Sequence, residues 1–186
     1  MIIPFQRVWS FPNADTFDIQ DIAYFVKKYL IKSELSVDPF ARNKRWATYT
    51  NDLNPETEAE YHLPAHEFLK LLQDKGVQAD LVLFDPPYSV TQLKECYAGI
   101  GMEFTEKDAQ SLGYKTERDL IDGILRPGGI VLSFGWSSTC MSEVKGYEII
   151  DLLLVSHGRR QHDTICLAER KAIAEPRLFG CSPTDL

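Results

Sequence analysis

The sequence is poor in cysteine and in long apolar runs. Its 186 residues include only four cysteines, none of them in a Cys-x-x-Cys pair, so neither a zinc cluster nor a compact disulfide framework is predicted, and we expect reduced thiols. No stretch approaches the roughly 18 apolar residues that cross a membrane. Pro4, Gln6 and Arg7 interrupt the N-terminal segment where a signal peptide would be continuously apolar. A cytoplasmic location without membrane contact is predicted.

Basic residues are fewer than acidic residues in this chain. The chain has 20 Lys plus Arg against 27 Asp plus Glu, a formal net charge of −7. A nucleic-acid partner would therefore have to be held by a local basic patch, because the field of the whole molecule repels it. With 44% hydrophobic residues and a length of 186, the composition is that of an ordinary globular protein. We expect a single domain over residues 1–186.

Strand and helix patterns alternate along the chain, which predicts an α/β protein with a mostly parallel sheet. Strands are expected at 35–38, 46–50, 81–84, 130–134, 147–155 and 163–169, and helices at 18–32, 64–75, 91–98, within 105–112 and at 119–125. The turn between the last two strands is short, so they are expected to form a C-terminal antiparallel hairpin. The long polar stretch 89–118 is expected to be an insertion on the substrate side.

The tetrapeptide Asp85-Pro86-Pro87-Tyr88 directly follows the apolar strand at 81–84. Ligands of a doubly wound sheet bind beyond the carboxyl ends of its strands, so this position indicates a binding site. Two prolines hold the chain extended and remove two amide donors, which leaves mostly acceptors. The Asp85 carboxylate and the Pro86 carbonyl can accept both hydrogens of an exocyclic amino group, and the Tyr88 ring offers a base a face to stack on. A simpler interpretation is that the tetrapeptide only ends the strand.

Such a set of acceptors would make an aromatic amine reactive. The lone pair of an amino nitrogen on a purine is delocalised into the ring, which makes the nitrogen a poor nucleophile. Hydrogen bonds to both N–H groups favour a tetrahedral nitrogen whose lone pair can point at an electrophilic methyl group. This is catalysis by held geometry and charge stabilisation. A target base in duplex DNA would have to be swung out of the stack to reach the site.

Several segments carry a resemblance to a known family. They are Trp9-Ser10-Phe11-Pro12-Asn13 with Asp15-Thr16-Phe17, Val37-Asp38-Pro39-Phe40-Ala41, Thr50-Asn51-Asp52-Leu53-Asn54-Pro55, Leu83-Phe84-Asp85-Pro86-Pro87-Tyr88-Ser89, Pro127-Gly128-Gly129-Ile130 with Ser133-Phe134-Gly135-Trp136, and His162-Asp163-Thr164-Ile165-Cys166. Over about residues 8–171, the chain resembles the S-adenosylmethionine-dependent DNA adenine-N6 methyltransferases of small phage and prophage type. The resemblance implies the class I (Rossmann-like) methyltransferase fold, S-adenosylmethionine as cofactor, DNA as partner and N6 of adenine as the methylated atom.

The resemblance also assigns residues to roles. Asp85, Pro86, Pro87 and Tyr88 would be the catalytic motif. Asp38, Pro39 and Phe40 would touch the methionine part of the cofactor, where an acid can hold the α-ammonium group. Thr16 and Phe17 would close over that end, and Asp52 or Asn54 would bind the ribose hydroxyls. Each acid could instead be a turn residue or a helix cap.

On the substrate side, the resemblance implies that Arg159 and Arg160 contact phosphates and that Trp136 walls the base pocket. The alternatives are a solvated turn for the arginines, as for the cluster of Arg42, Lys44 and Arg45, and a core position for Trp136.

Two departures from the family pattern leave other functions open. The usual glycine-rich loop after the first strand is missing, and Pro64 stands where an acid near the cofactor's adenine is usual. The chain could therefore be a methyltransferase-fold binding module or a subunit with little activity, or an enzyme that methylates RNA or a protein amide nitrogen. A protein partner or a homo-oligomer is a further possibility, and no metal site is expected.

Overall fold

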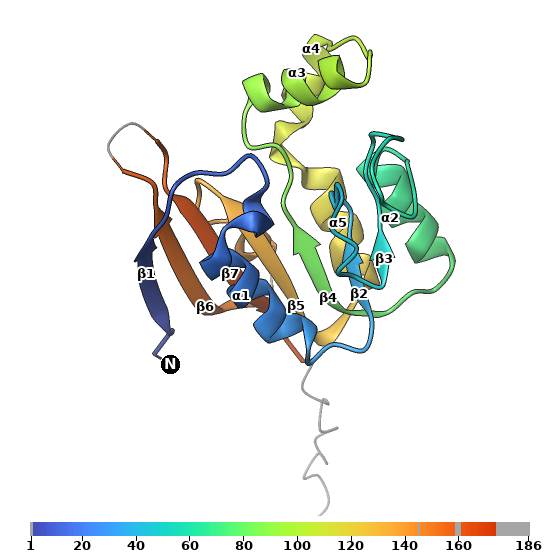
Figure 1. The fold of residues 1–186 in the computed structure, drawn as a ribbon. Coiled ribbons are helices and arrows are strands. Elements are labelled where there is room, and N and C mark those ends of the chain that lie inside the picture. Colours follow the sequence, from blue (N-terminus) through green and yellow to red (C-terminus); the bar gives the residue numbers. More distant parts are fainter. Residues whose placement is uncertain (1, 145, 159–160, 174–186) are drawn as a thin grey trace, which may run out of the picture.

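The computed structural model describes residues 2–144, 146–158 and 161–173. Its centre is a seven-stranded sheet in the order β1-β6-β7-β5-β4-β2-β3 (Figure 1). The strands are β1 (Phe5–Trp9), β2 (Ser36–Asp38), β3 (Tyr49–Thr50), β4 (Ala79–Phe84), β5 (Leu125–Gly135), β6 (Tyr147–Ser156) and β7 (Thr164–Lys171). Only β7 runs against its neighbours β5 and β6, while the other pairs are parallel. The predicted fold class and its C-terminal antiparallel hairpin are confirmed.

Helices cover both faces of the sheet. They are α1 (Gln20–Leu30), α2 (Ala65–Asp74), α3 (Val90–Gly99), α4 (Glu106–Gln110) and α5 (Lys115–Ile124), with short 3-10 turns at η1 (Thr16–Asp18), η2 (Ser111–Gly113) and η3 (Met141–Glu143). Helix α1 packs on one face against β4, β5, β6 and β7, and α2 and α5 pack on the other against β2, β4 and β5. Among the described residues, no helix is long and apolar enough to cross a membrane.

Alternating residues of β4 supply both cores. Leu81 and Leu83 lie in the core under α1, and Val82 and Phe84 lie in the core under α2 and α5. A central strand buried on both faces needs this continuous apolar run. Helix α2 fully buries Phe68, Leu69 and Leu72, each of which contributes about 1.5–3 kcal/mol by leaving water. The strand that carries Asp85 at its end is therefore held rigidly from both sides.

The structure differs from the sequence prediction at several element ends. Strand β1 was not predicted, because its exposed residues on the edge of the sheet show no apolar alternation. Strand β5 begins at Leu125, ahead of the predicted 130–134. Gly128 adopts φ +81° within it, a conformation that glycine takes freely, and the β4–β5 register shifts between Ala79 and Leu81. A proline-glycine segment expected to lie outside the sheet is thus a bulge inside it.

The polar stretch 89–118 folds into α3, α4 and the start of α5. Helices α3 and α4 stand beyond the carboxyl end of β4, away from the rest of the sheet (Figure 1). The Tyr114 hydroxyl donates to the Pro87 carbonyl at 3.0 Å and ties this segment to the chain that follows β4. Its assignment as a substrate-side insertion stays a prediction.

Candidate active site

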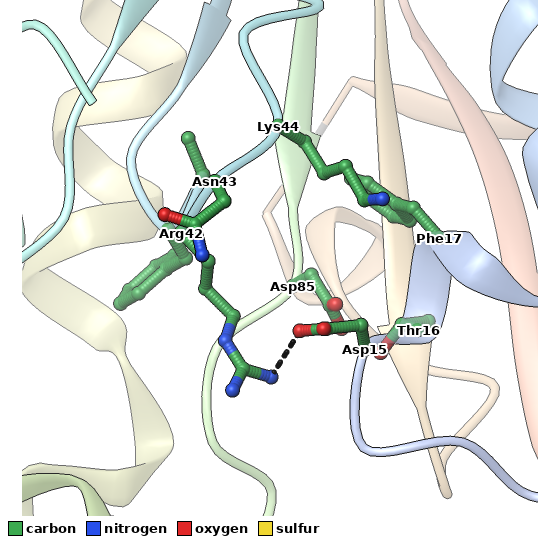
Figure 2. Close-up of a pocket in the computed structure, with 9 residues that line it drawn as sticks. Asp15, Thr16, Phe17, Arg42, Asn43, Lys44 and Asp85 are labelled. Atoms are coloured by element: carbon green, nitrogen blue, oxygen red, sulfur yellow. Dashed lines mark ion pairs between the residues drawn. The ribbon is translucent and has the colours of Figure 1, made fainter. Parts of the chain in front are cut away.

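The chain segments after β2, β3 and β4 meet at one edge of the sheet, because these strands are parallel and adjacent. Asp38 is the last residue of β2, and Asp85 follows β4 directly. The η1 turn approaches from the N-terminal segment, so that Thr16 and Phe17 line a small cavity together with Phe40 and Asp85 (Figure 2). Residues that are far apart in the sequence thus line one cavity, and their assigned cofactor and catalytic roles stay predictions.

Asp85 lies at the centre of this arrangement. Its carboxylate accepts a hydrogen bond from the Tyr88 hydroxyl and one from the Thr16 side chain. Burial raises the pKa of Asp85 to about 6, although both hydrogen bonds and the nearby Arg42 guanidinium act in the opposite direction. A carboxyl group with this pKa is ionised at neutral pH and still basic enough to take up a proton.

The rest of the motif is fixed by neighbouring groups. Pro86 is buried, the Pro87 carbonyl accepts from Tyr114, and the Tyr88 amide donates to Gln92 Oε1 at 2.8 Å. The Tyr88 ring is half-buried and its hydroxyl points at Asp85. Tyr88 therefore does more than offer a ring face, because its hydroxyl also holds the carboxylate in place.

Trp136 extends the aromatic surface beside Tyr88. The two ring centroids are 5.9 Å apart, and the centroid of the His162 ring lies 4.3 Å from that of Trp136. Trp136 follows the end of β5 and is 44% exposed, which rules out a core role. It lies where a wall of a base pocket is predicted.

Asp38 is fully buried. Its Oδ1 accepts from the Phe40 amide at 3.0 Å, whereas Oδ2 has no hydrogen-bond partner among the described residues. Burial raises the pKa of Asp38 well above its usual value, and the carboxylates of Asp85 and Asp52 raise it further. A buried acceptor without a donor is uncommon in folded proteins and suggests a missing cationic or hydrogen-bonding partner.

The loop after β2 is held against the N-terminal segment by ion pairs. Arg42 adopts φ +49°, and its guanidinium reaches the Asp15 carboxylate at 2.6 Å and the Ala14 carbonyl at 2.7 Å (Figure 2). Lys44 forms an ion pair with Asp18. Between the two segments lies a cavity of only about 50 Å³. Two members of the predicted basic cluster therefore bridge two chain segments, which the sequence did not indicate.

The candidate ribose ligands lie in a tight turn after β3. Asp52 Oδ2 accepts from the Arg42 amide at 3.1 Å and Oδ1 from the Asn54 amide at 2.8 Å. Asn54 Oδ1 in turn accepts from the Glu56 amide at 2.9 Å. Each carboxylate oxygen of Asp52 keeps a free lone pair. Binding of the ribose hydroxyls therefore stays a prediction, and the structural part that Asp52 plays in the turn is its alternative.

Asn51 is a site residue that the sequence analysis missed. Its Nδ2 donates to the carbonyls of Pro39 and Leu63 at 3.1 and 3.0 Å, and its Oδ1 accepts from the Leu63 amide. It thereby fixes the segment with Asp38 and Pro39 against the chain that leads into α2. Pro64 is the N-cap of α2. A buried asparagine between two loops has no periodic pattern that would reveal it.

The loop between β6 and β7 is described only in part. Arg159 and Arg160, the predicted phosphate contacts, lie outside the described residues. Nearby, His157 is buried and has a structural position, because its ring nitrogens lie 2.9 Å from the Ser10 carbonyl oxygen and from Thr164 Oγ1. The histidine links the chain after β1 to the start of β7.

The strand order, the single antiparallel strand and the loops gathered at the carboxyl edge define the class I methyltransferase fold. SMU.776, a suspected methyltransferase solved with SAH, superposes with a TM-score of 0.52 and 12% identity over 78% of this chain and 48% of its own. NSun6 from Pyrococcus horikoshii, solved with SFG, gives 0.50 and 13% over 78% and 50%.

The chain thus spans about half the length of these two proteins. At such low identities the likeness establishes the fold and nothing finer. No family model matches the sequence, and no curated protein matches it significantly.

Proposed function

We propose that this protein is an S-adenosylmethionine-dependent methyltransferase that transfers a methyl group to N6 of adenine in DNA. The observation that carries the proposal is Asp85, a carboxylate that follows the central strand and lies between the η1 cavity and the Tyr88 ring. The fold and the SAH complex reported for a structural neighbour support the cofactor. The Asp-Pro-Pro-Tyr sequence supports an exocyclic amine as the acceptor.

The residues present fit the cofactor. The unpartnered Oδ2 of Asp38 can bind its α-ammonium group, and the free lone pairs of Asp52 can bind its ribose hydroxyls. When bound, the cofactor would supply an electrophilic methyl group on a positively charged sulfur. Ligand sites usually enclose at least about 300 Å³, far more than the cavity of about 50 Å³ here. The Arg42–Asp15 ion pair joins the two segments that flank this cavity, so cofactor binding would need these segments to move apart.

Asp85 would act directly on the target amine. Its carboxylate accepts one N–H and the Pro86 carbonyl accepts the other, so the nitrogen lone pair turns out of the ring plane. As the amine takes up the methyl group that the cofactor would supply, the negative charge of Asp85 would stabilise the positive charge that develops on nitrogen. The surplus proton then passes through Asp85 to water. Tyr88 and Trp136 would hold the base by stacking.

The direct test is transfer of a labelled methyl group to DNA that lacks adenine methylation, with N6-methyladenine detected after digestion. Label in RNA or in a protein amide would move the acceptor to one of these classes. Calorimetric binding of the cofactor without transfer to any of them would favour the binding module, which the absent glycine loop and the small cavity also suggest. Failure to bind the cofactor would refute the proposal as a whole.

The pH dependence of the reaction is expected to follow Asp85. Its carboxylate must be ionised to accept the amine hydrogen, so kcat/KM should fall as pH decreases through about 6. Tyr88→Phe removes a hydrogen bond that lowers the pKa of Asp85, and the acidic limb should move to higher pH. Tyr97→Phe, which removes a hydroxyl bonded to Asp108 on α4, is the matched control. An unmoved limb in Tyr88→Phe would show that another group controls it.

A further inference from the structure

The free edge of the sheet at β1 carries an unusual amount of exposed apolar surface. Phe5 is 64% exposed, Trp9 59% and Phe11 75%, and the last two rings pack edge to face with centroids 4.7 Å apart. Strand β1 lies at the outer margin of the sheet beside β6, near the N-terminus (Figure 1). Large aromatic side chains grouped on a sheet edge are typical of a surface that binds another protein.

The outward backbone groups of β1 follow from its pairing. The Leu152 amide donates to the Pro4 carbonyl, and the Ser10 amide donates to the Ser156 carbonyl. In a parallel ladder alternate residues of a strand bond to the same neighbour, so residues 4, 6, 8 and 10 face β6. Phe5, Arg7 and Trp9 therefore direct their N–H and C=O groups away from the sheet. This row of donors and acceptors is able to pair with a further strand.

The side chains of these three residues lie on the face opposite α1. Val8, the residue between two of them, packs on the core under α1, and side chains alternate along a strand. On the same face, the half-buried Leu152 and Leu154 of β6 lie beside Phe5 and Arg7 in the β1–β6 register. The core under α2 and α5 includes Tyr147 as its only member from β1, β6 or β7 among the described residues. This end of the face is therefore apolar, and no helix of the described residues covers it.

We propose that two copies of the chain pair antiparallel through β1, with the two-fold axis at Gln6. In that register, Phe5 stands opposite Arg7 of the second copy, and Ile3 stands opposite Trp9 of the second copy. Phe5, Arg7 and Trp9 have their backbone groups directed outward, so this part of the ladder can close with ordinary hydrogen bonds. Because of the two-fold symmetry, the dimer contains two Phe5–Arg7 pairs and two Ile3–Trp9 pairs.

The chemistry of β1 selects a second copy of this chain as the partner. A guanidinium beside an aromatic ring is a favourable cross-strand pair, and Ile beside Trp buries apolar surface. The register shifted by one pair, with the axis at Arg7, would set the two arginines against each other. A two-fold pairing also uses the β1 edges of both copies at once, so assembly through β1 stops at the dimer.

The register can be tested with two variants of one exposed residue, Phe5. The wild-type chain, kept reduced, is expected to sediment as a dimer. Phe5→Arg places two like-charged pairs across the axis and should raise the dissociation constant at least about tenfold. Phe5→Glu loses the same ring but faces Arg7 of the second copy, and it should remain a dimer that weakens with added salt.

Circular dichroism would show that both variants are folded. A wild-type chain that stays monomeric at its highest soluble concentration would overturn the proposal. So would equal dissociation of both variants, because loss of apolar surface alone would then explain the effect. The experiment measures no methyl transfer, so its result is independent of the proposed reaction.

Discussion

Asp85→Asn is expected to reduce the rate of methyl transfer about a thousandfold or more while cofactor affinity stays nearly unchanged. The amide keeps the shape of the side chain and can still accept from the Tyr88 hydroxyl. It lacks the negative charge that would stabilise the developing positive charge on the amine nitrogen, and losses of this size follow removal of a single group aimed at a transition state. The measurements are single-turnover transfer to DNA and calorimetric binding of the cofactor.

A charge-matched control separates chemistry from general electrostatics. Asp74→Asn makes the same change at an exposed position at the end of α2, where the carboxylate pairs with Lys70 four residues away and with no other cation among the described residues. It should leave transfer intact. Asp85→Asn should not reduce folding stability, because the raised pKa of the half-buried carboxyl group shows that its surroundings disfavour the charge that the substitution removes. Transfer within tenfold of the wild-type rate, or a loss matched by weaker cofactor binding, would contradict the assigned role.

The sequence predicted the central part of the fold because burial leaves a strong local pattern there. Strand β4 is apolar at every position from Leu81 to Phe84, and the polar tetrapeptide after it stands out by contrast. The hairpin of β6 and β7 was also predicted, because two apolar runs with a short turn have few other ways to pack. Strand β1 escaped prediction because most of its side chains are exposed, so no burial constrains their type.

The residues of the candidate site were named from sequence motifs and their roles stay predictions, but the contacts among them were not predicted. Asp85 and Thr16 meet because η1 lies over the carboxyl end of β4, and no local pattern encodes a contact across that distance. The Arg42–Asp15 ion pair is of the same kind. From the sequence, the basic cluster of Arg42, Lys44 and Arg45 could be a solvated turn, whereas tertiary structure supplies acidic partners for Arg42 and Lys44. Charge in a sequence shows that a residue needs a partner, without showing which partner it has.

Asp38→Asn is expected to change folding stability and cofactor affinity in opposite directions. A buried carboxylate with one unpartnered oxygen destabilises the unliganded protein, and the neutral amide removes that charge while retaining an acceptor for the Phe40 amide. The unliganded variant should therefore be at least as stable as the wild type at neutral pH. A charge-assisted hydrogen bond to the α-ammonium would be lost. Its loss should reduce the binding free energy by about 1.5–3 kcal/mol, which raises the dissociation constant of the cofactor roughly ten- to hundredfold.

The pH dependence of that stability difference distinguishes the Asp38 charge from other effects of the substitution. The folded pKa of Asp38 lies above its unfolded value, so the wild type binds the proton more tightly when folded. It loses stability as pH rises from the unfolded pKa through the folded one. The advantage of Asp38→Asn should thus increase with pH and vanish in acid, as measured by denaturant unfolding without ligand. A variant that is less stable at neutral pH, or that binds the cofactor as tightly as wild type, would show that Asp38 only shapes the turn after β2.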